Sequence, residues 1–204
     1  MKVDYKKISP HKNSPRNHKI DTITIHCVVG QCSVESLGEQ FQISEASSNY
    51  GIGKDGRIGM YVEEKDRSWC SSNAANDNRA ITIECASDTK APYAVNDKVY
   101  ASLIELLVDI CKRNCIKKLV WSTNKNERVN HLNGCNMTVH RDYANKSCPG
   151  DYLYNRMGKI ADEVNKQLNS KIYRVQIGAF SSRENAEKYL VKAKKAGFDG
   201  VVIE

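Results

Sequence analysis

A histidine, a lysine and a cysteine lie close together between Met137 and Leu153, in the segment MTVHRDYANKSCPGDYL. His140 ends a short apolar run, Lys146 follows a polar stretch, and Cys148 precedes a Pro-Gly pair. Cysteine and histidine are common zinc ligands, and a catalytic zinc site keeps three protein ligands so that water takes the fourth position. His140 and Cys148 therefore need one more donor from elsewhere in the chain.

The third donor that the sequence favours is His26, at the end of the apolar run TITIH. Taken alone, a histidine at a strand end or a buried cysteine is more often structural than a ligand. The combination of His26 with His140 and Cys148 predicts a metal site with an open position. The alternative is a closed structural zinc site with four ligands from one loop: His131, Cys135, His140 and Cys148.

Hydrolysis at such a metal also needs a base and a cation. Glu84 interrupts the apolar run AITIECA, where a carboxylate is costly unless it is paired or functional. Lys146 lies two residues before Cys148, so an extended chain would point both side chains the same way. The structural alternatives are a buried partnership of Glu84 with Arg79 or a backbone amide, and a solvated loop lysine at Lys146.

Buried strands are expected to position these residues, because β-branched residues dominate the runs that carry them. The sequence predicts strands at 20–29, 80–86 and 117–121. An Asp-Gly turn also predicts a hairpin between 49–53 and 57–62.

Helices are expected to pack against this sheet. One begins at Ser33, a second spans 98–113, and a third runs from Pro149-Gly150 to about Leu168. The polar stretches 66–80 and 122–136 are expected to be loops. Alternating strands and helices indicate an α/β or α+β fold.

Composition narrows the class of protein. Of the 204 residues, 40% are hydrophobic and 27% are charged, which is typical of soluble globular proteins. The net charge of +7 favours an acidic partner, with simple solubility as the alternative. The lysines are dispersed without interleaved aromatic residues, so we expect no nucleic-acid partner. Neither a signal peptide nor a membrane span is apparent, so we expect synthesis in the cytoplasm with most of the eight cysteines reduced.

Five motifs, TITIH, NYGIGKDGRI, NRAITIE, MTVHRDY and KSCPG, together resemble the type 2 zinc N-acetylmuramoyl-L-alanine amidases. That family includes phage lysozyme-type amidases and peptidoglycan recognition proteins. The resemblance covers about residues 20–168 and implies a central mixed β-sheet flanked by helices, one catalytic Zn²⁺, and cleavage of the amide between N-acetylmuramic acid and L-alanine. By position it implies that the zinc ligands are His26, His140 and Cys148. It likewise implies that Lys146 stabilises the oxyanion and that Glu84 matches the carboxylate that serves as base in some branches of the family.

Two positions depart from the family pattern. Some relatives use a catalytic tyrosine where alignment on the KDG turn places Ser48. We therefore expect Tyr50 to be a packing or substrate-wall residue, with Asn49 and Trp69 as further substrate-binding candidates. The tryptophan-histidine pair of many relatives is here Trp69-Cys70.

Beyond the amidase-like part, the tail resembles the first half of a sporulation-related repeat, the SPOR domain, which is associated with glycan strands stripped of peptide. It reads as a small βαβ half-module with strands at 173–177 and 200–203 around a helix at 183–195. A packing appendage without binding function is the alternative. The expected organisation is an N-terminal arm at 1–19, a catalytic domain at 20–168, a linker at 169–172 and a partial wall-binding module at 173–204.

The resemblance implies a hydrolase of bacterial peptidoglycan. Without a signal peptide, we expect an endolysin that acts at the cell wall after release at lysis or non-classical export. A non-catalytic recognition domain, a cell autolysin and a recycling amidase are the alternatives.

Overall fold

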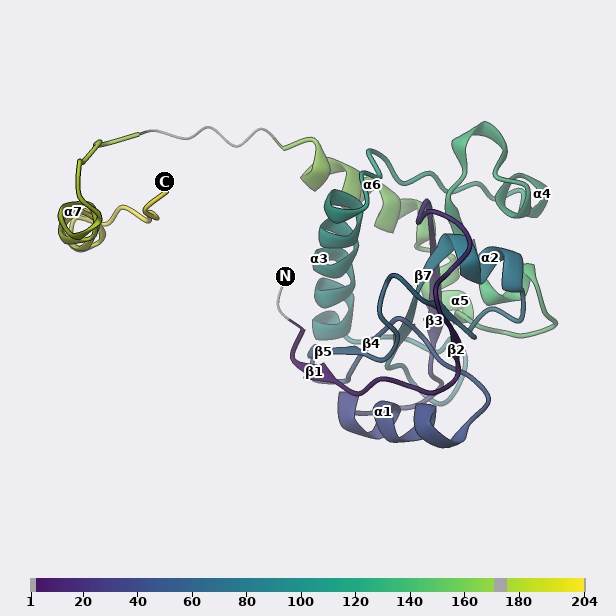
Figure 1. Ribbon diagram of the computed structural model, residues 1–204. Coiled ribbons are helices and arrows are strands. Elements are labelled where there is room, and N and C mark those ends of the chain that lie inside the picture. Colours follow the sequence, from purple (N-terminus) through teal and green to yellow (C-terminus); the bar gives the residue numbers. More distant parts are fainter. Residues whose placement is uncertain (1–2, 171–175, 204) are drawn as a thin grey trace. The chain divides into compact units, whose positions relative to one another are not determined.

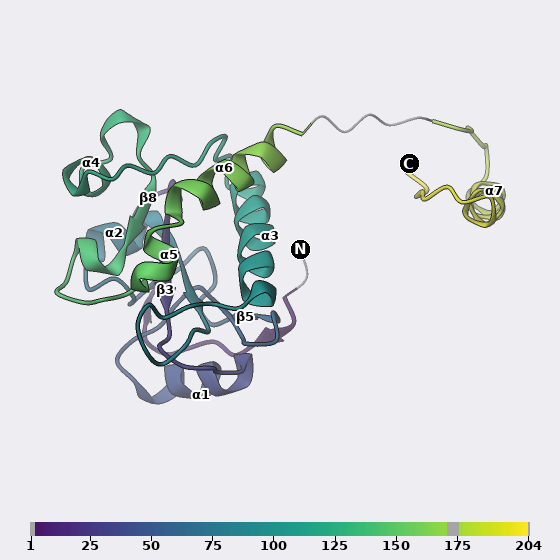
Figure 2. The same cartoon turned by 180° about the vertical axis from the view of Figure 1, so that it is seen from behind.

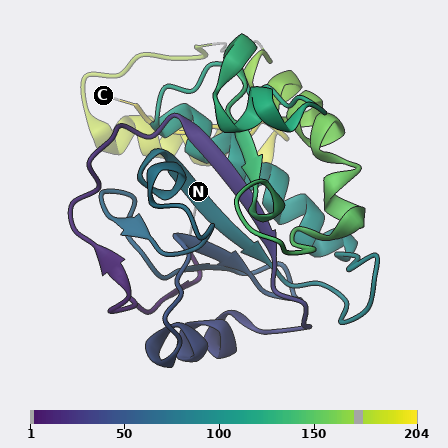
Figure 3. The same cartoon turned by 90° about the vertical axis from the view of Figure 1, so that its right-hand side faces the viewer.

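A mixed sheet of six strands carries the candidate site (Figure 1). The structure is a computed structural model that describes residues 3–170 and 176–203. In spatial order the strands are β1 (Tyr5–Lys6), β5 (Ile58–Met60), β4 (Tyr50–Ile52), β7 (Ala80–Cys85), β3 (Thr22–Cys27) and β8 (Met137–Val139). β3 is parallel to both of its neighbours, β7 and β8, whereas β4 and β5 are antiparallel. Figure 3 shows β3 and β7 running side by side across the unit.

Each central strand has one apolar face and one polar face, because successive side chains in a strand point to opposite sides. In β3, Ile23 and Ile25 belong to the main hydrophobic core. Thr24 and His26 lie on the other face. The register pairs His26 with Glu84 of β7, so the two candidate residues share the polar face near the carboxyl ends of their strands.

Hydrogen bonds between buried side chains hold this polar face together. The hydroxyls of Thr24 and Thr138 lie 2.8 Å apart, and the Asn76 amide donates to Thr24 at 3.0 Å. Ser68 and Thr82 make a further hydroxyl pair at 2.8 Å. Because these groups satisfy one another, the polar face forms a fixed layer that extends to the candidate site.

Helices cover the apolar face of the sheet. α3 (Asp97–Arg113) and α6 (Met157–Leu168) lie side by side over it, as Figures 1 and 2 show from opposite directions. α1 (Val34–Ile43) packs separately, with Leu37 and Phe41 against Tyr61. The expected fold class, a central mixed sheet flanked by helices, is confirmed.

Most of the regular elements follow the sequence prediction. The strands expected at 20–29 and 80–86 are present with shorter bounds, and the hairpin forms from β4 and β5. Ser33 caps α1 in a capping box with Ser36, and Asn96 caps α3 by accepting from the Val99 backbone N–H at 3.0 Å.

The prediction of a strand at 117–121 is wrong. That segment contains no regular structure, and amide side chains satisfy its backbone instead. Asn165 bonds both the N–H and the carbonyl of Leu119 at 2.8 Å, and Asn136 accepts from the Val120 N–H at 2.8 Å. The sheet position beside β3 is taken by β8.

The two polar stretches expected to be loops contain short elements. The first holds β6 (Arg67–Ser68) and α2 (Ala74–Arg79), and the second holds α4 (Lys125–Val129) and a turn of 3₁₀ helix at Leu132–Gly134. Asn73 and Asn124 cap the two helices through their side chains. Elements this short do not develop an apolar periodicity, which explains the missed prediction.

The helix expected from Pro149-Gly150 to Leu168 is also divided. It forms α5 (Gly150–Tyr154) and α6, with Asn155 and Arg156 between them. The Arg156 N–H bonds the carbonyl of Leu153, three residues earlier, instead of the carbonyl four residues earlier. This pattern is typical of a helix end, and α5 ends here.

Residues of the expected N-terminal arm are held against the domain. β1 pairs with β5, and β2 (Lys12–Asn13) pairs with β6. The Arg16 guanidinium donates to the carbonyls of Asp66, Asn78 and Ala80 at 2.9, 2.9 and 3.1 Å.

The chain separates into two compact units, Met1–Asn169 and Ser170–Glu204. In the second unit α7 spans Arg183–Lys195, as expected, with Ser182 as its N-cap. The strand predicted at 200–203 is not formed, since no described residue of this unit supplies a partner strand. The strand predicted at 173–177 falls largely outside the described residues. Within the described part of the chain, no helix is both long and apolar enough to cross a membrane.

Candidate metal centre and neighbouring residues

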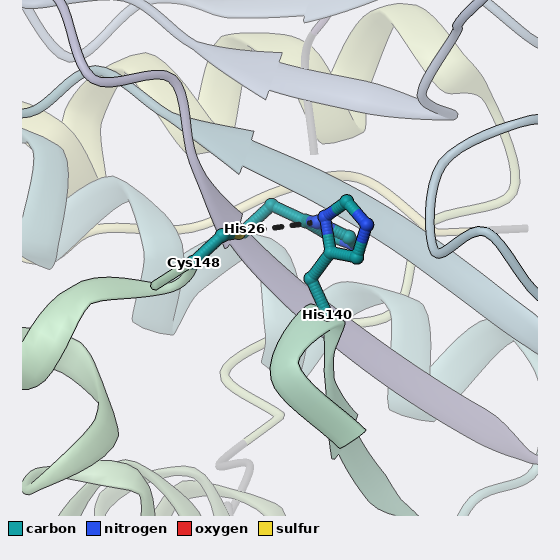
Figure 4. A group of neighbouring side chains, drawn as sticks. All are labelled: His26, His140 and Cys148. Carbon is teal, nitrogen blue, oxygen red and sulfur yellow. Dashed lines mark hydrogen bonds between the residues drawn. The ribbon is translucent and has the colours of Figure 1, made fainter. Parts of the chain in front are cut away.

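Three donor side chains converge at the carboxyl ends of β3 and β8 (Figure 4). The ligand atoms of His26, His140 and Cys148 all lie within 4.8 Å of one another. His26 Nδ1 is 3.4 Å from Cys148 Sγ, and the two imidazole rings meet edge to face at 5.1 Å between centroids. This arrangement could hold a divalent metal ion.

Burial keeps both histidines in the neutral form that a metal ligand requires. It lowers the pKa of His26 to about 3, and the nearby His140 adds to that shift. Burial and the positive charge of Lys146 lower the pKa of His140 as well. The hydrogen bond with Cys27, together with burial, raises the pKa of Cys148, so this thiol needs a metal ion to displace its proton.

A buried ion pair fixes the turn that carries His140. His140 begins a short 3₁₀ turn after β8, and Asp142 in that turn accepts from the Val139 backbone N–H at 3.1 Å. The Arg128 guanidinium donates two hydrogen bonds, of 2.6 and 3.0 Å, to the same carboxylate. Its guanidinium also stacks over the Trp121 ring at 4.4 Å. Sequence reasoning missed this pair, although Asp142 stands only two residues after His140.

The loop after this turn places Cys148. The Arg141 backbone N–H bonds the Cys148 carbonyl at 3.1 Å, which ties the loop back to the histidine turn. Gly150 then adopts φ of +77°, and a Cβ at this position would meet the Tyr93 side chain at 2.7 Å. Only glycine suits this backbone conformation and close approach, so Gly150 sets the path from Cys148 into α5.

Glu84 stands beside the metal donors. Its Oε1 is 3.9 Å from His26 Nδ1 and 3.9 Å from Cys70 Sγ, whereas its buried Oε2 has no hydrogen-bond partner. Burial, with a smaller contribution from Cys27, raises the pKa of Glu84 to about 8. A buried partnership with Arg79 is not formed, because Arg79 pairs with Asp21 at 2.8 Å.

Lys146 is exposed on the loop between His140 and Cys148, and its charge acts on His140. It lines a surface depression of about 410 Å³ together with Lys125, Arg141 and Tyr143. The structure therefore places a cation beside the candidate centre.

The three substrate-binding candidates lie in different surroundings. Tyr50 is 2% exposed and donates its hydroxyl to Glu64, and Asn49 is fully buried, with its carbonyl oxygen accepting from the Thr82 N–H. Burial agrees with the packing role expected as one alternative for Tyr50, and a contact of either residue with substrate stays a prediction. Trp69 is partly exposed and donates from its indole nitrogen to Asn13 at 2.7 Å, so a substrate contact there stays a prediction.

The closed four-ligand alternative is not assembled. Within the described residues the potential metal-binding groups are His26 with His140 and Cys148, and His26 with Cys70 and Glu84. His131 instead bonds the Cys135 backbone carbonyl at 3.2 Å.

Comparisons with known proteins agree with this geometry. The family described as N-acetylmuramoyl-L-alanine amidase matches residues 16–151, and the SPOR domain family matches residues 155–204. No curated protein matches the chain.

Solved structures share the fold at low sequence identity. The solution structure of the PlyG catalytic domain has a TM-score of 0.59 and 14% identity, over 86% of this chain and 100% of that one. The crystal structure of a selenomethionine AmpD derivative has a TM-score of 0.56 and 18% identity, over 79% and 96%. The endolysin N-acetylmuramoyl-L-alanine amidase LysCS from Clostridium intestinale URNW has a TM-score of 0.53 and 19% identity, over 83% and 94%.

The family match spans the segment from Arg16 to Asp151, which contains all three donors, Glu84 and Lys146. The chain therefore belongs to the N-acetylmuramoyl-L-alanine amidase family and is an enzyme of that class.

Proposed function

We propose that the chain hydrolyses the amide between N-acetylmuramic acid and L-alanine in peptidoglycan, with one zinc ion held by His26, His140 and Cys148. The observation that carries this proposal is the convergence of three neutral or ionisable donors from two strand ends and a loop. Three ligands leave a fourth position for water, the arrangement of catalytic rather than structural zinc sites.

The donor geometry fits zinc. With Zn–N near 2.0–2.1 Å and Zn–S near 2.3 Å, a tetrahedral ion would separate a nitrogen and a sulfur ligand by about 3.6 Å. The separation between His26 Nδ1 and Cys148 Sγ is 3.4 Å. Two imidazoles and a thiolate are also a donor set that zinc prefers over magnesium or calcium.

Each protein group then has a chemical task. Bound zinc would polarise the scissile carbonyl and lower the pKa of a water molecule. Glu84, beside His26, accepts the proton of the attacking water and returns it to the leaving amine of L-alanine. The Lys146 ammonium stabilises the negative charge that develops on the carbonyl oxygen.

The proposal also covers the domain organisation of the chain and the place where it acts. We place the catalytic domain at 20–168, the linker at 169–172 and a partial wall-binding module at 173–204. The SPOR match supports contact with glycan strands, although it begins at residue 155 and so includes α6, whose Ile160 and Val164 pack in the core of the first unit. We also propose synthesis in the cytoplasm and action at the cell wall after release at lysis or non-classical export. The name endolysin, borne by the LysCS protein whose fold the chain shares, supports only the action at the wall.

Digestion of purified cell walls tests the proposed reaction. We expect new L-alanine amino termini without new reducing sugar ends, and we expect a chelator to abolish their release. New reducing ends would indicate a glycosidase and would overturn the proposal.

A further inference from the structure

A second cysteine lies against the candidate ligand Cys148. Cys27 follows His26 directly in β3, and its backbone N–H donates to Cys148 Sγ at 3.4 Å. The two thiols also share a hydrogen bond. Cys27 belongs to the main hydrophobic core, and Cys148 packs against that same core. Residues that are 121 positions apart in the chain thus lie against each other at the end of β3.

The two thiols differ in access. Cys148 is partly exposed, whereas Cys27 is 5% exposed. A small oxidant therefore reaches Cys148 first and finds Cys27 behind it. This is the arrangement of an oxidisable cysteine with a resolving cysteine. All eight cysteines are free thiols, so neither sulfur is engaged in another disulfide.

We propose that Cys27 and Cys148 form a reversible disulfide when the protein meets a peroxide, and that this modification disables the metal centre. Peroxide oxidises the Cys148 thiol to a sulfenic acid, with one peroxide oxygen transferred to sulfur and the other leaving as water. The Cys27 thiol then attacks that sulfur, the S–S bond forms, and water leaves. The two cysteines lose two electrons in total, and the peroxide gains them.

The consequence for metal binding rests on the proposed function. A disulfide sulfur is not a thiolate, and the thiolate is the form of cysteine that ligates metal. The crosslinked chain therefore keeps only His26 and His140 as donors. We expect bound zinc to be released as the disulfide forms and to be bound again after reduction.

Peptide mapping of the metal-free protein treated with hydrogen peroxide tests the disulfide without reference to activity. Trypsin places Cys148 on the peptide 147–156, and it leaves Cys27 together with Cys32 on the peptide 20–54. We expect these two peptides to be joined by a bond that dithiothreitol cleaves. The same linkage in a Cys32→Ala variant assigns it to Cys27.

Two matched variants test whether Cys27 is the resolving cysteine or only a buried neighbour of Cys148. In Cys27→Ala we expect Cys148 to progress to sulfinic acid, which dithiothreitol does not restore. Cys85 is the control, because it is fully buried and pairs with Cys27 across β3 and β7. A Cys85→Ala variant is expected to form the crosslink as the wild type does. A linkage from Cys148 to another cysteine, or full recovery of Cys27→Ala by dithiothreitol, would overturn the proposal.

Zinc release is the second readout, followed with a chromophoric zinc indicator on the loaded protein. We expect one ion to be lost for each crosslink formed, and retention of the ion in crosslinked protein would refute the effect on the metal centre. Failure of the proposed function looks different: the untreated protein would neither bind zinc nor cleave wall amides, while the metal-free mapping would still report the disulfide.

Discussion

Replacement of Arg128 by alanine is the sharpest test of how the fold holds His140. The guanidinium is 2% exposed and the Asp142 carboxylate 1%, so the variant leaves a charged group buried without its partner. Removing one member of a buried ion pair costs about 3–5 kcal/mol of unfolding free energy. For a chain of this length we expect the melting temperature of the metal-free protein to fall by about 10 °C.

Arg57 provides a matched control. It also binds a carboxylate through two hydrogen bonds, to Glu35 at 2.6 and 3.0 Å, but both side chains are more than 40% exposed. Water screens exposed ion pairs and they contribute little to stability, so Arg57→Ala is expected to change the melting temperature little.

Thermal unfolding followed by circular dichroism measures both variants under one set of conditions. A double variant, Arg128→Met with Asp142→Leu, should recover much of the loss, because neither charge is then left buried. Equal melting temperatures for Arg128→Ala and Arg57→Ala would refute the assignment of Arg128 as the residue that fixes the His140 turn.

Further predictions concern the centre itself. Cys148→Ser is expected to weaken zinc binding at least about 10-fold in a competition titration, and unchanged affinity would exclude Cys148 as a ligand. Glu84→Gln is expected to lower kcat by about 10²–10⁴-fold with zinc still bound, and full activity would exclude Glu84 as the base. In the metal-free protein, the raised pKa of Glu84 means that the folded state binds the extra proton, so wild type should lose stability relative to Glu84→Gln as pH rises from about 4.5 to about 8. A difference in melting temperature that is independent of pH would contradict this. Lys146→Met is expected to lower kcat more than it raises KM, and the reverse would indicate a role in substrate binding alone.

The sequence predicted the parts of the fold that local patterns determine. β-branched runs marked β3 and β7, the Asp-Gly turn marked the β4–β5 hairpin, and Ser33 marked the start of α1. The donors His26, His140 and Cys148 were chosen by residue type and by resemblance to a family. The structure places their ligand atoms together.

The missed features depend on contacts between distant residues. The segment 117–121 looks like a strand, but Asn136 and Asn165 satisfy its backbone from 16 and 46 positions away. The burial of Tyr50 and Asn49 likewise results from tertiary packing, and no local pattern distinguishes a substrate wall from a buried layer. The Arg128–Asp142 pair and the Cys27–Cys148 contact arise only when β3, α4 and the loop after β8 are assembled.

The metal content of the purified protein, measured with amide cleavage for wild type and His26→Ala, tests the central claim most directly. We predict one zinc ion for each wild-type chain, with release of L-alanine amino termini, and loss of both in His26→Ala. Full retention of zinc and activity in that variant would contradict the proposed centre.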